Sequence, residues 1–122
     1  MRIYCLEDNP LVVLHLEMMI EDAGHDCVGS AASFAEALPQ WQDLEFDLAL
    51  IDIDLADGVT GMDAARWLKE RGRVGCFVTG QGDLARENAD LVVDIVTKPI
   101  DETALLRAID LAGAGPQPPG SA

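Results

Sequence analysis

Acidic, hydroxyl and ammonium side chains directly follow several short apolar runs in this sequence. Five of them have types that could do chemistry together: Glu7, Asp8, Asp52, Thr79 and Lys98. Three carboxylates within a few ångströms of one another repel, so such a group either raises a pKa or binds a cation. Carboxylate oxygens with room for water suit Mg²⁺, which usually keeps several waters and takes a phosphate oxygen as a further ligand. These residue types therefore predict a Mg²⁺ site that receives a phosphoryl group.

The other two side chains also suit a phosphoryl group. Lys98 can pair with it as a point charge, and Thr79 can hydrogen-bond to another of its oxygens. The sequence has no zinc-ligand spacing, no Gly-x-Gly-x-x-Gly loop, no Walker loop and no motif of a base-activated serine or cysteine. A carboxylate is therefore the predicted nucleophile.

Short apolar runs alternate with segments of helical period, which is typical of βαβ units and a parallel sheet. The predicted strands are Ile3 to Leu6, about Cys27 to Ser30, Leu48 to Ile51, Val74 to Thr79, and a strand within Leu91 to Val96. Ligands bind beyond the carboxyl ends of the strands in such sheets, so the five side chains are expected to meet at one edge. We expect one domain over residues 1–112, followed by a flexible tail rich in glycine and proline over residues 113–122.

Capping residues place the first helix between the first two strands. Asn9 is its expected cap, Pro10 occupies the first helical position, and Gly24 ends it. Three apolar residues share one stripe of this helix: Leu11, Leu14 and Met18.

The later helices have similar signals. Ser33 and Glu36 form a capping box for the second helix, which Pro39 is expected to shorten. The segment from Gly80 to Asp90 has two glycines and little periodicity, so the fourth helix should be short or irregular. A turn precedes the third helix, and its residues include Asp57, Gly58 and Gly61.

Charge and composition exclude several classes of partner. The chain has 22 acidic and 8 basic residues and a formal net charge of −14, which repels phosphate backbones and anionic membranes. We therefore expect no nucleic acid and no membrane as partners. The sequence has no signal-peptide pattern and no apolar run long enough to span a bilayer, so a cytoplasmic location is expected. Cys5, Cys27 and Cys76 lie in apolar runs and are predicted to be buried rather than redox-active.

Four short motifs, in this order, resemble the receiver domain of bacterial two-component response regulators. They are Leu6-Glu7-Asp8-Asn9-Pro10, the segment from Asp47 to Leu55 with Asp52-Ile53-Asp54, then Val78-Thr79-Gly80, and Thr97-Lys98-Pro99. The resemblance covers about residues 2–112 and is strongest to small stand-alone receivers of alphaproteobacteria. It implies a flavodoxin-like α/β fold, a doubly wound parallel sheet of five strands in the order 2-1-3-4-5 with helices on both faces.

The resemblance also implies how the carboxylates act. Asp52 would accept a phosphoryl group from a histidine kinase or a histidine phosphotransfer protein. Asp8 and Asp52 would ligate Mg²⁺ directly, Glu7 would act through water, and the carbonyl of Asp54 would complete the protein ligands.

The same resemblance assigns roles to the residues after the fourth and fifth strands. Lys98 would neutralise the acyl phosphate, and Thr79 would move toward it and carry the following loop into an active arrangement. The Lys98-Pro99 peptide bond is expected to be cis. Asp54 and Gln81 occupy positions that tune the lifetime of the acyl phosphate in this family.

The expected function is that of a single-domain response regulator, a switch that binds a downstream protein or relays phosphate. It would assist its own phosphorylation and dephosphorylation without being an enzyme for an external metabolite. Two alternatives stay open: a receiver domain cut from a hybrid kinase or larger regulator, and a pseudo-receiver that binds partners without phosphorylation. Ile95, where many receivers have Tyr or Phe, and the short segment before Lys98 slightly favour the pseudo-receiver.

Overall fold

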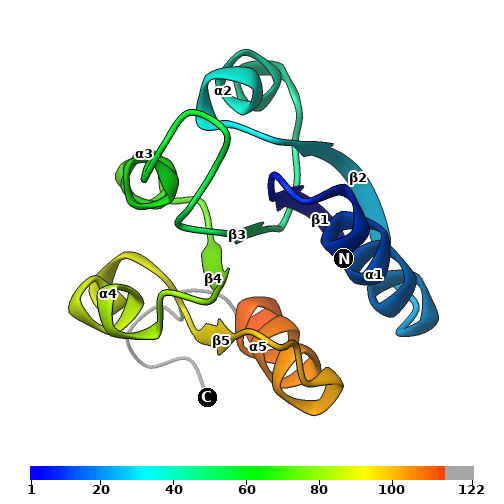
Figure 1. The fold of residues 1–122 in the computed structure, drawn as a ribbon. Helices are drawn as coiled ribbons and strands as arrows, with labels where there is room; N and C mark the ends of the chain where they lie inside the picture. The colour runs from blue at the N-terminus through cyan, green and yellow to red at the C-terminus, as the bar shows by residue number, and fades with distance from the viewer. Residues whose placement is uncertain (115–122) are drawn as a thin grey trace, which may run out of the picture.

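The computed structural model describes residues 1–114 as a five-stranded parallel sheet with helices on both sides (Figure 1). The strand order is β2-β1-β3-β4-β5, and all neighbouring strands are parallel. The strands are β1 (Arg2–Leu6), β2 (Asp26–Ala31), β3 (Leu48–Ile51), β4 (Gly75–Thr79) and β5 (Ile95–Thr97). The helices are α1 (Pro10–Asp22), α2 (Phe34–Asp43), α3 (Gly61–Glu70), α4 (Gly82–Glu87), the 3-10 helix η1 (Ala89–Leu91) and α5 (Glu102–Ala114). The predicted fold class and strand order are confirmed.

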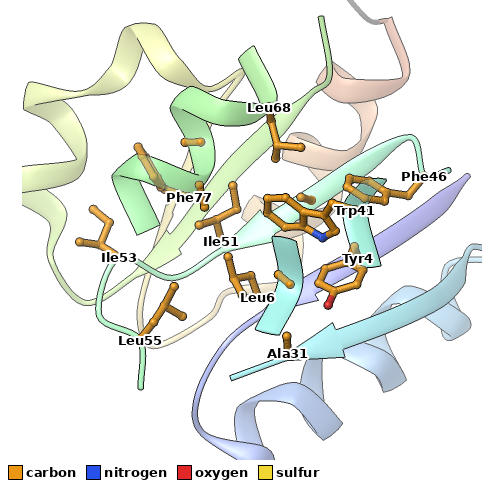
Figure 2. Close-up of a cluster of buried hydrophobic side chains, with 14 of the residues drawn as sticks. Tyr4, Leu6, Ala31, Trp41, Phe46, Ile51, Ile53, Leu55, Leu68 and Phe77 are labelled. Atoms are coloured by element: carbon orange, nitrogen blue, oxygen red, sulfur yellow. The ribbon is translucent and has the colours of Figure 1, made fainter. Parts of the chain in front are cut away.

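Two apolar clusters hold the helices against the two faces of the sheet. α1 and α5 pack on one face, where Leu16 and Leu105 are buried. α2, α3 and α4 cover the other face, where the rings of Tyr4 and Trp41 meet edge to face with centroids 5.5 Å apart (Figure 2). All four residues of β3 are buried and alternate between the two clusters, as expected of a central strand covered on both faces.

α1 begins and ends where the sequence predicts, but its predicted apolar stripe faces solvent. The side chain of Asn9 accepts a hydrogen bond from the Leu11 N–H at 3.0 Å, and Gly24 follows the helix with φ of +86°. The helix packs on the sheet through a different set of residues: Leu16, Met19 and Ile20. The exposed fractions are 76% for Leu11, 53% for Leu14 and 57% for Met18. The apolar surface of α1 therefore extends beyond what the core uses.

α2 is longer than its proline predicts. The capping interaction is present, because the Ser33 Oγ accepts a hydrogen bond from the Glu36 N–H at 3.1 Å. The helix nevertheless continues past Pro39 to Asp43, so the predicted shortening is wrong. Pro39 lies on the exposed side and removes one N–H donor, whereas the buried Trp41 on the following turn keeps the helix packed on the sheet.

The C-terminal elements differ from the predicted boundaries in two places. β5 ends at Thr97, beyond the predicted range, and Leu91 at the start of that range belongs to η1. α4 is short, as predicted. α5 includes Gly113 and Ala114, which the sequence assigned to the tail, and the rest of the predicted tail lies outside the described residues. Within residues 1–114, no helix is both long and apolar enough to cross a membrane.

The three cysteines are free thiols. Cys5 and Cys76 are buried, as predicted, but the prediction is wrong for Cys27, which lies on the edge strand β2 and is only partly buried. The Sγ atoms of Cys5 and Cys27 lie 3.9 Å apart on the neighbouring strands β1 and β2. The fold therefore brings together two thiols that are well separated in the sequence.

Candidate functional site

The register of β1 and β3 brings the acidic side chains together. Leu6 is paired with Ile51, so Glu7 and Asp52, the residues that follow, leave the sheet side by side. The Asp52 N–H donates to the Leu6 carbonyl at 2.9 Å, which continues this register beyond the last strand residues. Glu7, Asp8 and Asp52 each offer a carboxylate oxygen within 4.8 Å of the other two. These are the three carboxylates that the sequence places at this edge of the sheet.

Lys98 reaches the acidic cluster from the end of β5. Its backbone N–H donates to the Thr79 carbonyl at 2.9 Å, which continues the pairing of β4 and β5. The ammonium Nζ donates to Asp52 Oδ2 at 2.8 Å and to Glu7 Oε1. The Lys98-Pro99 peptide bond is cis, as the resemblance implied. The ends of three strands therefore meet through one ammonium and two buried carboxylates.

Burial and pairing shift the proton affinities of this cluster. Glu7 is 3% exposed and Asp52 is 6% exposed. Burial raises the pKa of Glu7, and the hydrogen bonds from Lys98 and from the Asn9 N–H offset this only in part. Burial alone would lower the pKa of Lys98, but the hydrogen bonds to Asp52 and Glu7 outweigh it and raise the pKa. Lys98 therefore remains an ammonium at neutral pH.

The charge of the cluster fits a divalent cation. Counted at their formal charges, three carboxylates and one ammonium sum to −2 in a partly buried site. Burial is the main cause of the raised pKa of Glu7, and the neighbouring carboxyl groups of Asp8 and Asp52 add to it. Oxygen donors at this spacing and this net charge suit Mg²⁺.

Gln81 links the segments that follow β3 and β4 beside the acidic cluster. Its Nε2 donates to Asp54 Oδ2 at 2.8 Å, and its backbone N–H donates to the Thr79 hydroxyl at 3.1 Å. Thr79 is buried, and it holds a backbone N–H as strand-end threonines commonly do. The Asp54 N–H donates to Asp52 Oδ1 at 3.3 Å, while the Asp54 carboxylate pairs with Gln81. The family resemblance assigned Asp54 and Gln81 the same role, tuning the lifetime of the acyl phosphate, but did not predict that their side chains are hydrogen-bonded.

The segment between β3 and α3 is fixed by two features. A Cβ added to Gly61 would lie 2.1 Å from the Asp52 carbonyl oxygen, so α3 can begin this close to β3 only with glycine there. Asp57 accepts hydrogen bonds from the N–H groups of Phe34 and Ala35 at the start of α2. Sequence reasoning placed Asp57 in a turn and missed this contact, because no local pattern connects residues more than twenty positions apart.

Comparison with known proteins identifies relatives that share this region. Residues 3–110 match the response regulator receiver domain family. The phyllosphere-induced regulator PhyR of Methylorubrum extorquens is 40% identical over 64 residues, which is 52% of this chain and 24% of PhyR. The sensor protein GacS of Pseudomonas syringae pv. syringae is 30% identical over 117 residues, which is 88% of this chain and 13% of GacS. This chain therefore matches a quarter or less of the length of these relatives.

Two solved structures share the fold along nearly their whole length. The solution structure of the receiver (REC) domain of Erythrobacter litoralis PhyR is 28% identical, with a TM-score of 0.85 and coverage of 99% of this chain and 95% of that one. SdrG from Sphingomonas melonis Fr1 is 26% identical, with a TM-score of 0.76 and coverage of 91% of this chain and 94% of that one. Family match, strand order and overall fold agree, and the chain belongs to the response regulator receiver domain family.

Proposed function

We propose that this receiver domain is a phosphoryl-accepting switch and that Asp52 is the acceptor. The observation that carries the proposal is the ammonium of Lys98, which lies 2.8 Å from the buried carboxylate of Asp52 and also binds Glu7. Such an ammonium, beside a carboxylate cluster that fits Mg²⁺, suits the negative charge of an entering phosphoryl group. The proposed donor is the phosphohistidine of a histidine kinase or of a histidine phosphotransfer protein, as in the family.

In the proposed transfer, a carboxylate oxygen of Asp52 attacks the phosphorus atom of the phosphohistidine. The P–O bond to Asp52 forms and the P–N bond to the imidazole breaks. The electron pair of that bond stays on the imidazole nitrogen, which takes a proton from solvent. Lys98 then stabilises the acyl phosphate through a charge-assisted hydrogen bond. Hydrolysis returns the carboxylate and inorganic phosphate, so the chain assists its own reactions and turns over no external metabolite.

Asp8 and Asp52 would hold Mg²⁺ directly, Glu7 would act through water, and the Asp54 carbonyl would complete the protein ligands. When bound, Mg²⁺ neutralises phosphoryl oxygens that the carboxylates would otherwise repel. The spacing and net charge of the acidic cluster support this assignment. Asp8 is exposed, which leaves the side of the cluster from which a donor protein would approach open to solvent.

Thr79 would couple the phosphoryl group to the segment after β4. Its hydroxyl accepts a hydrogen bond from the Gln81 N–H, so it can still donate its own proton to a phosphoryl oxygen. Movement of Thr79 toward that oxygen would carry Gln81 with it, because the two residues are hydrogen-bonded. Gln81 in turn holds the Asp54 carboxylate. We therefore propose that Asp54 and Gln81 act as a pair that tunes the lifetime of the acyl phosphate.

The proposed output is binding of a downstream protein or onward transfer of phosphate. The exposed stripe of α1 lies directly after Asp8 and offers an apolar contact next to the acidic cluster: Leu11, Leu14 and Met18. Ile95 is half-buried against the core and has no aromatic ring to report phosphorylation. The net charge of −14 disfavours nucleic acid and anionic membranes, and a cytoplasmic location accords with phosphotransfer from a kinase.

A second candidate is that this domain works as one unit of a longer signalling protein. The similarity to GacS favours it, because the match covers 88% of this chain but only 13% of GacS. The switch chemistry would be the same, and the output would pass to covalently linked domains. Reading the coding sequence on both sides of the segment distinguishes this arrangement from a single-domain regulator.

The proposed function is tested by intact mass after incubation with acetyl phosphate, with and without Mg²⁺. We expect one phosphoryl adduct that requires Mg²⁺ and disappears in Asp52→Asn. Asp63→Asn is the matched control, because Asp63 is an exposed carboxylate on α3 that pairs with Arg66 and does not belong to the acidic cluster. This control should keep the full adduct.

Two results would contradict the proposal. If the unchanged protein forms no adduct with Mg²⁺ present, a pseudo-receiver that binds partners without phosphorylation becomes the better description. If Asp52→Asn keeps the adduct, the acceptor is another residue. The proposed donor is tested separately with a purified phosphotransfer protein that carries phosphohistidine. The phosphate that this protein loses should equal the phosphate that this chain gains.

A further inference from the structure

The carboxylate of Asp57 joins the segment after β3 to the start of α2. Its Oδ1 accepts hydrogen bonds from the Phe34 N–H at 3.3 Å and from the Thr60 hydroxyl at 2.7 Å. Its Oδ2 accepts a hydrogen bond from the Ala35 N–H at 3.1 Å. Asp57 lies in the nine-residue stretch 52–60 that begins at the proposed phosphoacceptor, whereas Phe34 and Ala35 belong to a different helix. One side chain therefore connects α2, the stretch after Asp52 and the residue before α3.

Asp57 completes a helix cap that α2 cannot complete by itself. The first N–H groups of a helix have no carbonyl partners within the helix. Ser33 Oγ takes the Glu36 N–H and the Ser33 carbonyl takes the Ala37 N–H, but neither reaches Phe34 or Ala35. Asp57 takes both remaining N–H groups, and a carboxylate at a helix N-terminus is also favoured by the helix dipole. The contact uses both acceptor oxygens of the carboxylate.

Backbone hydrogen bonds also hold other residues of the stretch 52–60. The Ala56 N–H donates to the Ala32 carbonyl at 2.9 Å, just before α2. Leu55 and Gly58 exchange backbone hydrogen bonds of 2.9 and 3.0 Å, and Leu55 is buried in the core. Gly58 has φ of +105°, a conformation that glycine adopts readily. Ala56 and Asp57 are exposed, so hydrogen bonds to Ala32 and to the start of α2, rather than side-chain burial, hold these two residues.

We propose that Asp57 is a positioning residue for the phosphorylation site and acts by holding the stretch after Asp52 against α2. This inference rests on the proposed function, because the cluster it serves is the proposed Mg²⁺ and phosphoryl site. The Asp54 backbone, which supplies a proposed Mg²⁺ ligand, lies between the fixed end of β3 and the Asp57 anchor. Without the anchor, the stretch samples other conformations, and the apparent affinity for Mg²⁺ falls by the fraction that remains competent.

The test measures Mg²⁺ binding by titration calorimetry on the full chain, well below its unfolding temperature. Asp57→Ala should weaken Mg²⁺ binding by about threefold to tenfold, as expected if the competent fraction falls to roughly a third or a tenth. Asp57→Asn should lie between that variant and the unchanged protein, since one amide oxygen can replace only part of the contact. Glu36→Ala is the matched control: Glu36 caps the same end of α2 by accepting the Ala32 N–H at 3.0 Å, but it does not touch Asp57.

A second readout follows the anchor without any metal. Amide hydrogen exchange over residues 53–60 should be faster in Asp57→Ala than in Glu36→Ala. Unchanged exchange in this stretch together with unchanged Mg²⁺ affinity would overturn the inference. Equal weakening of Mg²⁺ binding by the two variants would also overturn it, because the effect would then come from the end of α2 in general. If the unchanged protein binds no Mg²⁺, the proposed function itself fails, and this inference fails with it.

Discussion

Replacing Gly61 with alanine should destabilise the protein by forcing α3 away from β3. The added Cβ would lie 2.1 Å from the Asp52 carbonyl oxygen, 2.5 Å from the Ile53 Cα and 2.8 Å from the Asp52 carbonyl carbon. These are all backbone atoms, so no side chain can rotate to relieve the overlap. Ordinary contact begins near 3.4 Å. The start of α3 therefore has to move by about 1 Å in an interior that is otherwise closely packed.

Two terms set the size of the effect. The shift breaks the hydrogen bond from the Gly61 N–H to the Ile53 carbonyl, which measures 3.1 Å, and such a loss costs about 1 kcal/mol. Overpacking against backbone adds about 2 kcal/mol. A total of about 3 kcal/mol lowers the thermal midpoint by about 12 °C, at roughly 4 °C per kcal/mol for a domain of this size.

Thermal unfolding followed by circular dichroism checks this value, with Gly80→Ala as the matched control. Gly80 directly follows β4, and an added Cβ there meets nothing within 4 Å. The control should melt within about 2 °C of the unchanged protein, as exposed substitutions usually do. Equal midpoints for Gly61→Ala and Gly80→Ala would refute the reasoning, because they would mean that α3 does not begin against the Asp52 carbonyl.

Three further outcomes are expected. Mg²⁺ at about 100 times its Kd should raise the thermal midpoint by about 10 °C, since binding of that strength adds about 2.7 kcal/mol, and Asp52→Asn should reduce the shift. Asp54→Ala and Gln81→Ala should each change the half-life of the phosphoryl adduct, and the double variant should change it no further than the stronger single variant, because both break one hydrogen bond. Slight burial raises the pKa of Asp57, but the hydrogen bonds from Thr60 and from two backbone N–H groups outweigh it and lower the pKa below 3.8. Its stabilisation is therefore complete above pH 3.8 and is lost as the pH falls through the folded-state value, so the midpoints of the unchanged protein and Asp57→Asn should converge in acid.

The strands were predictable to the extent that each one is buried. β3 runs from Leu48 to Ile51 as predicted, because a strand covered on both faces is apolar at every position. β5 is an edge strand of three residues, and the apolar residue Leu91 before it belongs to η1. A short apolar run fits either structure, so its sequence pattern does not locate β5.

Helical periodicity identified α1 but not the face that packs on the sheet. This helix has two apolar stripes, and Leu16 and Ile20 lie in the core while Leu11 and Leu14 are exposed. Both stripes have helical spacing, so periodicity alone cannot assign the inner one. The choice depends on how the helix is oriented over β1 and β2, which is a tertiary property.

The site residues also fall into two groups, those that the sequence predicts and those that depend on tertiary contacts. Glu7, Asp52 and Lys98 directly follow strands, so backbone register fixes where they meet, and a reading of strand ends predicts them. The contacts of Asp57 with α2 and of Gln81 with Asp54 join segments more than twenty residues apart through side chains. Such contacts depend on how the loops are closed, and no short motif records them. It follows that the two groups should respond differently to substitution: changes at the strand ends should abolish phosphoryl acceptance, whereas changes at Asp57 or Gln81 should leave the acceptor in place and alter the Mg²⁺ affinity or the adduct lifetime.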